Sequence, residues 1–290
     1  MKKNNYSAVH INSVSLLGLM MGVIVSKKNS VKNIIVHSHN DGLMTIKYRL
    51  VKVVSDYILK KYANYFFACS ERAAMWKFPR NVIEGKKYKV IKNGIDTEKF
   101  KFDTKIREEY REQLRIQKKF VLGHVGRFEE QKNHEFIINV FQEVLKINKN
   151  AVLILIGEGN LKERIENIAK EKKIQENIMF LGIRDDVNYI LQAMDVFVFP
   201  SIFEGLGIAV IEAECSGLPV ICSDKLPKEV EITDRVHKIS LAKGAEKWAD
   251  KILKVKDKSN REIYYKEINC NGYDIKEVAN KMEEFYLKLI

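Results

Sequence analysis

The strongest constraint on the fold is a regular alternation of short apolar runs and helical stretches after residue 119. The apolar runs predict strands at Phe120–Val125, Val152–Ile156, Ile178–Leu181, Val196–Phe199 and Val220–Cys222. Helical periodicity lies between and after them, at His134–Ile147, Leu161–Lys172, Val187–Met194 and Gly207–Ser216. Strands separated by helices form a parallel sheet with right-handed crossovers. We therefore predict an α/β domain that binds its ligands at the carboxyl ends of the strands.

The first 100 residues show a similar but incomplete alternation. Strands are predicted at Ala8–Ile11, Asn33–His37, Tyr65–Cys69 and Val90–Ile91, with an amphipathic helix over Leu43–Tyr62. These are too few strands for a complete doubly wound domain. We predict a partial domain at 1–100, a charged connector at 101–118, a second domain at 119–274, and a helix at 275–290 that packs back toward the first domain.

An apolar run at Val14–Val25, preceded by Lys2 and Lys3, resembles a signal peptide. No small-x-small cleavage site follows it before Lys27, and the run is too short to span a bilayer. A buried helix is the favoured interpretation. The cysteines at 69, 215, 222 and 270 lack metal-type spacing, which indicates structural thiols in a reducing cytoplasm.

The net charge of +12 lies entirely in the first 100 residues, which hold 18 basic and 6 acidic side chains. Such a half is attracted to anionic lipid, phosphorylated substrate or nucleic acid, although a solvated basic face is also possible. We disfavour nucleic acid because the sequence has no RNP-type aromatics, zinc spacing or helix-turn-helix signature.

The segment FEGLGIAVIEAECSG at 203–217 places two carboxylates around a glycine turn and an apolar helix. Glu212 lies inside that helix, where a carboxylate must find hydrogen-bond donors or shift its pKa. The turn Glu204–Gly207 can offer backbone N–H groups to a phosphate at the helix N-terminus. A ligand with phosphate and hydroxyls would satisfy both. The alternatives are an acid/base pair, as in glycoside hydrolases, and a helix-internal ion pair at Glu212.

A second glycine turn, GRFEEQKN at 126–133, carries two cations ahead of a helix. The Arg127 guanidinium can form two parallel hydrogen bonds with a phosphate, and Lys132 adds a compact positive charge. A plain surface loop would have the same composition. Gly157-Glu158-Gly159 resembles part of the dinucleotide fingerprint. Lys162 stands where the third glycine belongs, so NAD binding is disfavoured.

These segments together, with LIGEGNL at 155–161, FLGIRDDV at 180–187, the block at 195–224 and VIKNGID at 90–96, resemble the GT4 family of nucleotide-sugar glycosyltransferases. The resemblance implies the GT-B fold, with two Rossmann-like domains of parallel strands. The N-terminal one is incomplete here, because a full member begins with roughly 80 further residues. The implied activity is retaining transfer of a sugar from a nucleotide-diphosphate donor, which we expect to be a UDP-sugar. The acceptor would be a glycan or lipid-linked oligosaccharide in capsule or exopolysaccharide synthesis.

The resemblance also assigns roles to residues. Glu212 would hold the ribose and Glu204 the donor sugar, while Arg184 would contact the base. The diphosphate would lie among Gly126, Arg127, Lys132 and the backbone of Gly205, Leu206 and Gly207. A strand-end histidine would face the reacting sugar; we select His39, beside Asn40 and Asp41, and keep His37 in reserve. The implied catalytic set is His39, Arg127, Lys132 and Glu204.

No cofactor is expected, and the lack of an Asp-x-Asp motif means that the sequence does not require a metal. An alternative for a shortened chain is a catalytically silent protein that binds a nucleotide-sugar or a partner subunit. A lipid-linked acceptor would suit peripheral attachment to the inner face of the membrane. The basic residues proposed for that contact are Lys47, Arg49, Lys52, Lys60 and Lys61.

Overall fold

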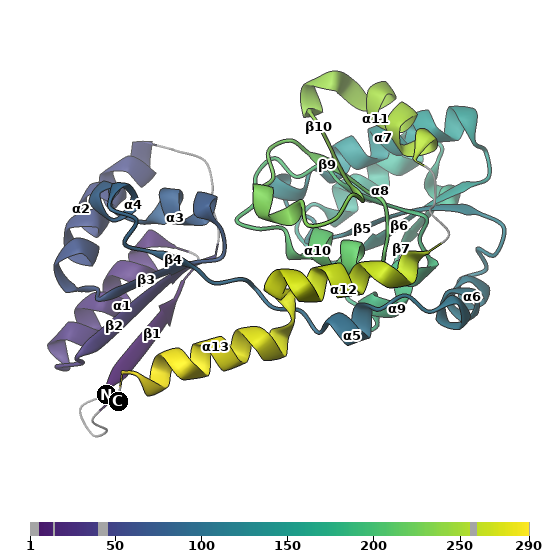
Figure 1. The fold of residues 1–290 in the computed structure, drawn as a ribbon. Coiled ribbons are helices and arrows are strands. Elements are labelled where there is room, and N and C mark those ends of the chain that lie inside the picture. Colours follow the sequence, from purple (N-terminus) through teal and green to yellow (C-terminus); the bar gives the residue numbers. More distant parts are fainter. Residues whose placement is uncertain (1–5, 14, 40–45, 256–259, 290) are drawn as a thin grey trace. The chain divides into compact units, whose positions relative to one another are not determined.

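The computed structural model describes residues 6–13, 15–39, 46–255 and 260–289. The chain forms two compact units (Figure 1). The first comprises Met1–Gly94, Glu204–Leu206 and Gly272–Ile290, and the second comprises Ile95–Phe203 and Gly207–Asn271. Both are built on parallel sheets, as the alternation of strands and helices predicts.

The first unit contains a four-stranded parallel sheet. Its strands, in spatial order, are β1 (Ala8–Asn12), β2 (Asn33–Ser38), β3 (Tyr65–Ala68) and β4 (Lys89–Val90). Helices α1 (Leu16–Lys28) and α2 (Ile46–Tyr62) pack against each other, and α3 (Glu71–Lys77) and α4 (Arg80–Glu84) connect β3 to β4. The four predicted strands are therefore all present.

The apolar run near the N-terminus forms helix α1 as predicted, but only one face of this helix is buried, because Leu17, Met21 and Val25 are exposed. The Ser15 side chain caps it by accepting a hydrogen bond from the backbone N–H of Gly18. Leu19 and Val23 are fully buried, whereas Val14 lies outside the described residues. Across the described ranges, none of the helices is both long and apolar enough to cross a membrane.

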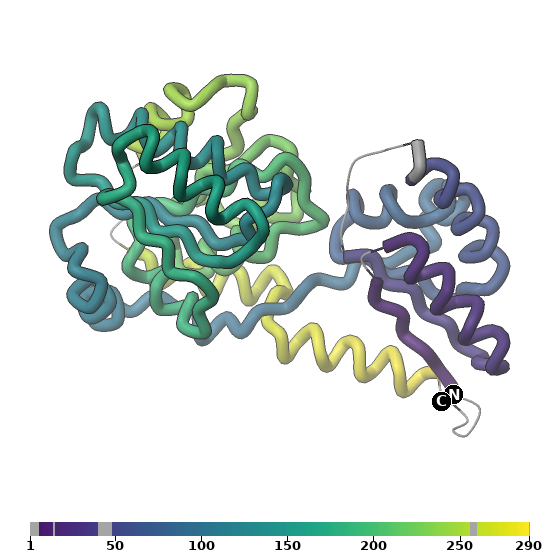
Figure 2. Tube along the Cα trace, turned by 180° about the vertical axis from the view of Figure 1, so that it is seen from behind, coloured from purple at the N-terminus to yellow at the C-terminus, as the bar shows by residue number. Residues whose placement is uncertain are grey.

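The C-terminal helix α13 (Ile275–Leu287) also belongs to the first unit. Figure 2 shows it in yellow, with its C-terminal end close to the start of β1 in purple. Phe285 contacts Tyr65 and Phe67 edge to face, with ring centroids 5.1 and 4.9 Å apart. These aromatic contacts fix α13 against the first sheet.

The second unit contains a six-stranded parallel sheet in the order β10-β9-β8-β5-β6-β7. The strands are β5 (Phe120–Val125), β6 (Ala151–Ile156), β7 (Ile178–Phe180), β8 (Val196–Phe199), β9 (Val220–Ser223) and β10 (Val236–Ile239). The chain builds one half outward from β5 and then crosses over to begin the other half at β8. The switch point therefore lies between β5 and β8, where open α/β sheets bind ligands at the carboxyl ends of their strands.

Two helical layers cover this sheet (Figure 1). One contains α7 (His134–Ile147), α8 (Lys162–Glu171) and α11 (Gly244–Lys254). The other contains α5 (Thr97–Phe100), α6 (Thr104–Gln113), α9 (Val187–Ala193), α10 (Ile208–Cys215) and α12 (Tyr264–Ile268). Apolar side chains of β5, β6, β8, α7 and α11 form a continuous core around the fully buried Trp248.

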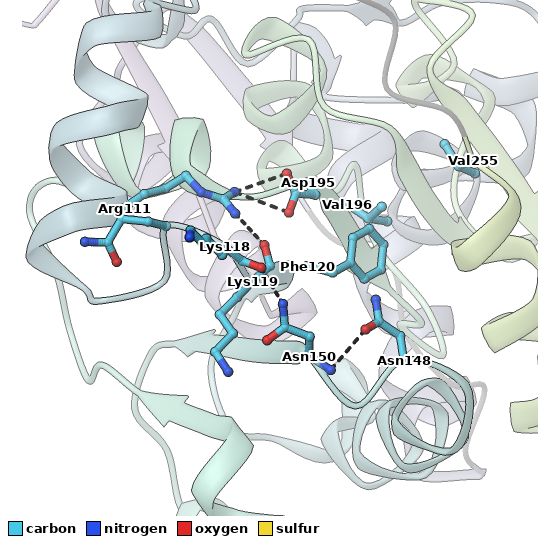
Figure 3. A pocket seen from close by; sticks show the side chains of 10 residues that line it. Arg111, Lys118, Lys119, Phe120, Asn148, Asn150, Asp195, Val196 and Val255 are labelled. Atoms are coloured by element: carbon cyan, nitrogen blue, oxygen red, sulfur yellow. Dashed lines mark hydrogen bonds and ion pairs between the residues drawn. The ribbon is translucent and has the colours of Figure 1, made fainter.

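An ion-pair cluster at the amino ends of β5 and β8 fixes α6 to the second sheet. Asp195 accepts hydrogen bonds from the Val121 backbone N–H at 2.8 Å and from Arg111 Nη1 at 3.2 Å, and it also pairs with Arg107. Asp195 and Arg111 border a depression of about 430 Å³ (Figure 3). Arg111 is bonded there to Asp195 and to the Lys119 carbonyl, and Asn150 is bonded to the Lys118 carbonyl (Figure 3), whereas the motif loops begin at the opposite ends of the strands. We therefore assign the depression a structural role, in which its polar groups attach α6 to the second sheet.

Replacing Asp195 with Asn should destabilise the second unit by about 2–4 kcal/mol, because two guanidinium groups lose their counter-charge while Arg111 stays buried. Urea unfolding should be followed by the fluorescence of Trp248 in a Trp76→Phe background. Asp250→Asn, at an exposed pair with Lys247 3.6 Å away, serves as the control and should cost less than about 0.5 kcal/mol. Equal losses in the two variants would contradict the assignment.

Candidate functional site

A loop that we call the cationic loop, residues 126–133, connects the carboxyl end of β5 to α7. The Arg127 side chain is 74% exposed and pairs with Glu129 at 3.0 Å. The Lys132 ammonium lies 4.6 Å from the ring centroid of Phe199, the last residue of β8. Lys132 therefore places its charge at the switch point between β5 and β8, whereas Arg127 extends into solvent.

Hydrogen bonds fasten the cationic loop to the segment after β8. The Gln131 carbonyl accepts from the Ile202 N–H at 2.9 Å, and the Gln131 side chain donates to the Phe203 carbonyl at 2.9 Å. The Asn133 side chain donates to the Pro200 carbonyl at 3.3 Å. The two loops that carry the sequence motifs are thus joined, and Gln131, which we did not single out from the sequence, makes two of these bonds.

The glycines after β6 allow a second close contact with the cationic loop. The Gly126 N–H donates to the Ile156 carbonyl and the Phe128 N–H to the Glu158 carbonyl, at 2.9 and 3.0 Å. Gly157 has φ +137°, and a Cβ there would lie 2.2 Å from the Gly126 carbonyl oxygen. The absence of a side chain at Gly157 therefore permits its backbone to approach the backbone of Gly126 this closely. This gives the incomplete dinucleotide pattern a structural explanation.

Two buried histidines, also missed from the sequence, underlie the cationic loop. His124 donates from Nδ1 to the Val198 carbonyl at 2.8 Å, and its Nε2 has no partner among the described residues. The His134 ring stacks on Phe128 at 4.0 Å, and neither of its nitrogens has a partner there. Burial and then the nearby Lys132 charge lower the pKa of His134 to about 4. Both rings are therefore neutral near pH 7, and Lys132 carries the positive charge.

The glycine turn begins with a buried carboxylate and ends at helix α10. Glu204 and Leu206 are 6% and 3% exposed, and the Gly205 carbonyl accepts a hydrogen bond from the Ser70 hydroxyl. Glu204, Gly205 and Leu206 belong to the first unit. Gly207 opens the helix with φ +91° and ψ 56°, a left-handed conformation that favours glycine. The turn thus presents backbone N–H groups ahead of an eight-residue helix.

Glu212 lies on α10 in an apolar environment. Within the described part of the chain, no hydrogen bond or ion pair engages its carboxylate, so the helix-internal ion pair considered from the sequence is not formed there. Burial raises the pKa of Glu212 to about 7. The neighbouring Glu214 is fully buried, whereas Glu212 is half-buried, and Glu214 accepts hydrogen bonds from the Thr233 N–H and hydroxyl at 2.9 and 2.8 Å. Glu212 is therefore an acceptor that a hydroxyl-bearing ligand could satisfy.

Arg184 follows β7 and borders a hollow of about 540 Å³ with Lys99, Asp186 and Tyr189. Its guanidinium donates to both carboxylate oxygens of Asp186, at 2.8 and 2.6 Å. The side chain is 43% exposed. One edge of the guanidinium is therefore already occupied, and contact with a base would have to use the remaining edge or the planar face of the group.

His39 lies at the carboxyl end of β2, within the first unit. Its Nε2 is 2.8 Å from the Asn12 side-chain oxygen, and its ring centroid is 4.0 Å from that of His37. Burial is the main cause of its lowered pKa, and Lys77 contributes to the lowering. Asn40 and Asp41, which we expected beside it, lie outside the described residues. Across the described ranges, no group of three or more His, Cys, Asp or Glu side chains could hold a metal ion.

Comparison with protein families gives one match over most of the second unit. The family described as Glycosyl transferases group 1 matches residues 106–273, a range that contains the cationic loop, Arg184 and the segment from Glu204 to Glu212.

Two curated proteins align along the full length of the chain. The EpsF protein of Bacillus subtilis is 29% identical over 288 residues, covering 97% of this chain and 74% of EpsF. The UDP-Gal:alpha-D-GlcNAc-diphosphoundecaprenol alpha-1,3-galactosyltransferase of Escherichia coli is 26% identical over 308 residues, covering 100% of this chain and 77% of that enzyme.

A solved structure shares the fold. The crystal structure of Anabaena HepE in complex with UDP and glucose superposes with a TM-score of 0.80 at 19% identity, covering 97% of this chain and 77% of that chain. The likeness confirms the predicted α/β GT-B fold, here with parallel sheets of four and six strands.

Replacing Glu212 with Gln should stabilise the protein at alkaline pH. The unfolded carboxyl releases its proton near pH 4.5 and the folded one near pH 7. The folded state therefore binds more protons between these values, and stability falls as the pH rises through them. The glutamine variant escapes this loss, so its gain over the unmodified chain should be near zero at pH 4 and about 1–3 kcal/mol at pH 8.

Urea unfolding of both proteins at pH 4, 6 and 8 measures this difference. Glu163→Gln, an exposed position in the first turn of α8, provides the matched control and should change stability by less than about 0.5 kcal/mol at every pH. A Glu212→Gln protein that is no more stable at pH 8 than the unmodified chain would show that the carboxylate is not strained.

Proposed function

Because the chain belongs to the family Glycosyl transferases group 1, we propose that it moves a sugar from a UDP-linked donor to a hydroxyl of a glycan or lipid-linked oligosaccharide, with retention at the anomeric carbon, in polysaccharide biosynthesis. One observation carries the donor assignment: Glu212 is half-buried, has its pKa raised to about 7, and has no partner among the described residues. A ribose diol supplies the donors that such a carboxylate lacks.

The ribose and the diphosphate of the donor are assigned to different parts of one helix, α10. The ribose lies at Glu212, and the diphosphate lies at the N-terminus of α10, near Gly207 and the Lys132 ammonium. Gly207 and Glu212 are five positions apart, which corresponds to about 7.5 Å along a helix. This separation suits the reach from a ribose to its 5′-diphosphate. Glu204 is assigned to the donor-sugar hydroxyls, and the loop that contains Arg184 is assigned to the base.

The proposed chemistry consists of positioning and electrostatic stabilisation. As the bond between the anomeric carbon and the diphosphate breaks, negative charge accumulates on the leaving phosphate. Lys132, Arg127 and the N–H groups at Gly207 supply positive potential there. Phe199 below Lys132 and the neutral His134 beside it provide a surrounding of low polarity, which strengthens that interaction.

The similar proteins support the choice of donor and acceptor class. The Escherichia coli relative is named for a UDP-galactose donor and a diphosphoundecaprenol acceptor, and the HepE structure contains UDP and glucose. We assign donor binding to residues 119–274 and the acceptor side to residues 1–100, with 101–118 as connector and the helix at 275–290 packing on the acceptor side. His39 is assigned to face the reacting sugar.

Binding of UDP and of uridine to one variant in the cationic loop and one in α10 tests the donor assignment. Lys132→Met should weaken UDP binding by about 10- to 100-fold and leave uridine binding unchanged, because only the phosphate contact is lost. Glu212→Gln should weaken both ligands by about 10-fold, because both contain the ribose. Isothermal titration calorimetry at pH 8 measures all four affinities.

Lys146→Met, an exposed lysine on α7 in the same unit, serves as the control and should bind both ligands as the unmodified chain does. Release of UDP from UDP-glucose and UDP-galactose is measured in parallel. Binding of UDP without any release would favour the catalytically silent alternative. Equal weakening of uridine and UDP by Lys132→Met would contradict the diphosphate assignment.

We also propose that the first unit attaches to the cytoplasmic face of an anionic membrane. Its packed helices α1 and α2 expose an apolar surface made of Leu17, Met21, Val25, Leu50, Val53, Val54 and Tyr57. The exposed basic residues Lys28, Arg49, Lys60 and Lys61 lie on the same helices. Lys52 is engaged with Asp56 at 2.5 Å and with the Phe78 carbonyl, and the Lys47 side chain lies outside the described part.

A Leu50→Asp/Val53→Asp variant should lose binding to phosphatidylglycerol vesicles by at least about 10-fold, because it removes apolar contact and adds repulsion. Both side chains are about 70% exposed, so the fold should persist. Vesicle sedimentation at two salt concentrations measures the loss, with Ile147→Asp in the second unit as the control. Binding that ignores salt, or that survives the double substitution, would contradict this surface.

A further inference from the structure

One face of the first unit's sheet carries polar side chains under the C-terminal helix. The register pairs His10 with Ile35 and Tyr65 across the three strands, and Asn12 with His37 and Phe67. Since side chains of a strand alternate between faces, His10, Asn12, His37 and Phe67 share one face with each other. His39 follows two residues after His37 at the same edge. The C-terminal end of helix α13 contacts this face through Phe285 and Tyr286.

A chain of hydrogen bonds crosses this face. The Tyr286 hydroxyl lies 2.5 Å from His10 Nδ1, and His10 Nε2 lies 3.1 Å from His37 Nδ1. The rings of His10 and His37 are nearly parallel, with centroids 5.2 Å apart, and the ring of His39 lies 4.0 Å from that of His37. The hydrogen-bonded chain therefore runs from the C-terminal helix to His37, and a ring contact links His37 to His39.

We propose that Tyr286 is a positioning residue that acts through His10 and His37 to fix the orientation of His39. The proposal rests on the proposed function, in which His39 faces the reacting sugar. Tyr286 itself is 276 residues from His10 in the sequence, and it is assigned no contact with either substrate.

The chain leaves the imidazoles little freedom in where they hold their protons. A neutral imidazole has one N–H and one acceptor nitrogen. When Tyr286 donates to His10 Nδ1, His10 carries its proton on Nε2 and donates to His37 Nδ1, so His37 also carries its proton on Nε2. When the chain runs in the opposite direction, both rings carry the proton on Nδ1. The two rings therefore share one tautomer.

The charges around His39 make its ring sensitive to this arrangement. His39 pairs with Asn12 on one side and lies against the ring of His37, tilted by 35°, on the other. Lys77 of α3 and the side chain of Asn93, which follows β4, also act on it. Because burial lowers the pKa of His37 to about 3, His37 remains neutral and presents His39 with an uncharged ring in one orientation.

The hydroxyl of Tyr286 is separable from the packing of α13. Phe285 provides aromatic contacts with Tyr65 and Phe67, while the Tyr286 ring contacts His10 edge to face at 6.0 Å. In addition, His37 Nε2 is buried and has no partner among the described residues. A network built only for stability would not normally leave such an atom unsatisfied.

Tyr286→Phe removes the hydroxyl and keeps the ring. We expect kcat for sugar transfer to fall about 10-fold, with the Kd for UDP unchanged, because the donor contacts are on other residues. Long-range ¹H–¹⁵N spectra of the histidine rings should show one shared tautomer for His10 and His37 in the unmodified chain and a mixture in the variant. His10→Phe should give the same loss in kcat, and the double variant should lose no more than either single variant.

Tyr65→Phe, on the same face against α13, is the matched control and should leave kcat and the ring spectra unchanged. A Tyr286→Phe protein with a lower Tm but unaltered spectra for His37 and His39 would overturn the proposal, since the hydroxyl would then be only structural. Additive losses in the double variant would overturn it as well. If the unmodified chain transfers no sugar, the proposed function fails and the ring spectra alone decide the role of Tyr286.

Discussion

The candidate donor site depends on the way the cationic loop is held at the switch point of the second sheet. Gln131 and Asn133 bond it to the segment after β8, and Gly126 and Phe128 bond it to the segment after β6. Because these bonds fix the loop on both sides, the Lys132 ammonium is already held over the Phe199 ring before a ligand binds. A preorganised cation costs little reorganisation when charge develops on a leaving group.

The same region contains polar groups that reduce stability. The half-buried Glu212 carboxylate has no partner among the described residues, and neither do three nitrogens of the buried His124 and His134 rings. Such groups cost free energy unless a ligand engages them. Their concentration around one loop and one helix agrees with a binding site, where local strain is normally found. In the first unit, His37 is the comparable case, at the edge where His39 lies.

Much of the fold follows from the sequence because buried parallel strands are continuous apolar runs. Phe120–Val125 and Val196–Phe199 were predicted with the bounds that the structure has. The edge strand Val236–Ile239 was missed because His237 and Lys238 interrupt its apolar character and all four residues are only half-buried. The sequence also identified the motif loops, but the role of Gln131 could not be found that way, since its hydrogen bonds join segments about 70 residues apart. Likewise, the pairing of Arg184 with Asp186 depends on loop geometry that composition does not determine.

The most direct test of the account is a crystal structure of the chain with UDP. The account predicts the ribose hydroxyls on the Glu212 carboxylate, and the diphosphate at Gly207 within reach of Lys132. It further predicts that both the ribose and the diphosphate lie at the carboxyl ends of the strands of the second sheet. UDP bound elsewhere, for example in the depression beside Arg111 and Asp195 at the opposite edge, with Glu212 left untouched, would contradict it.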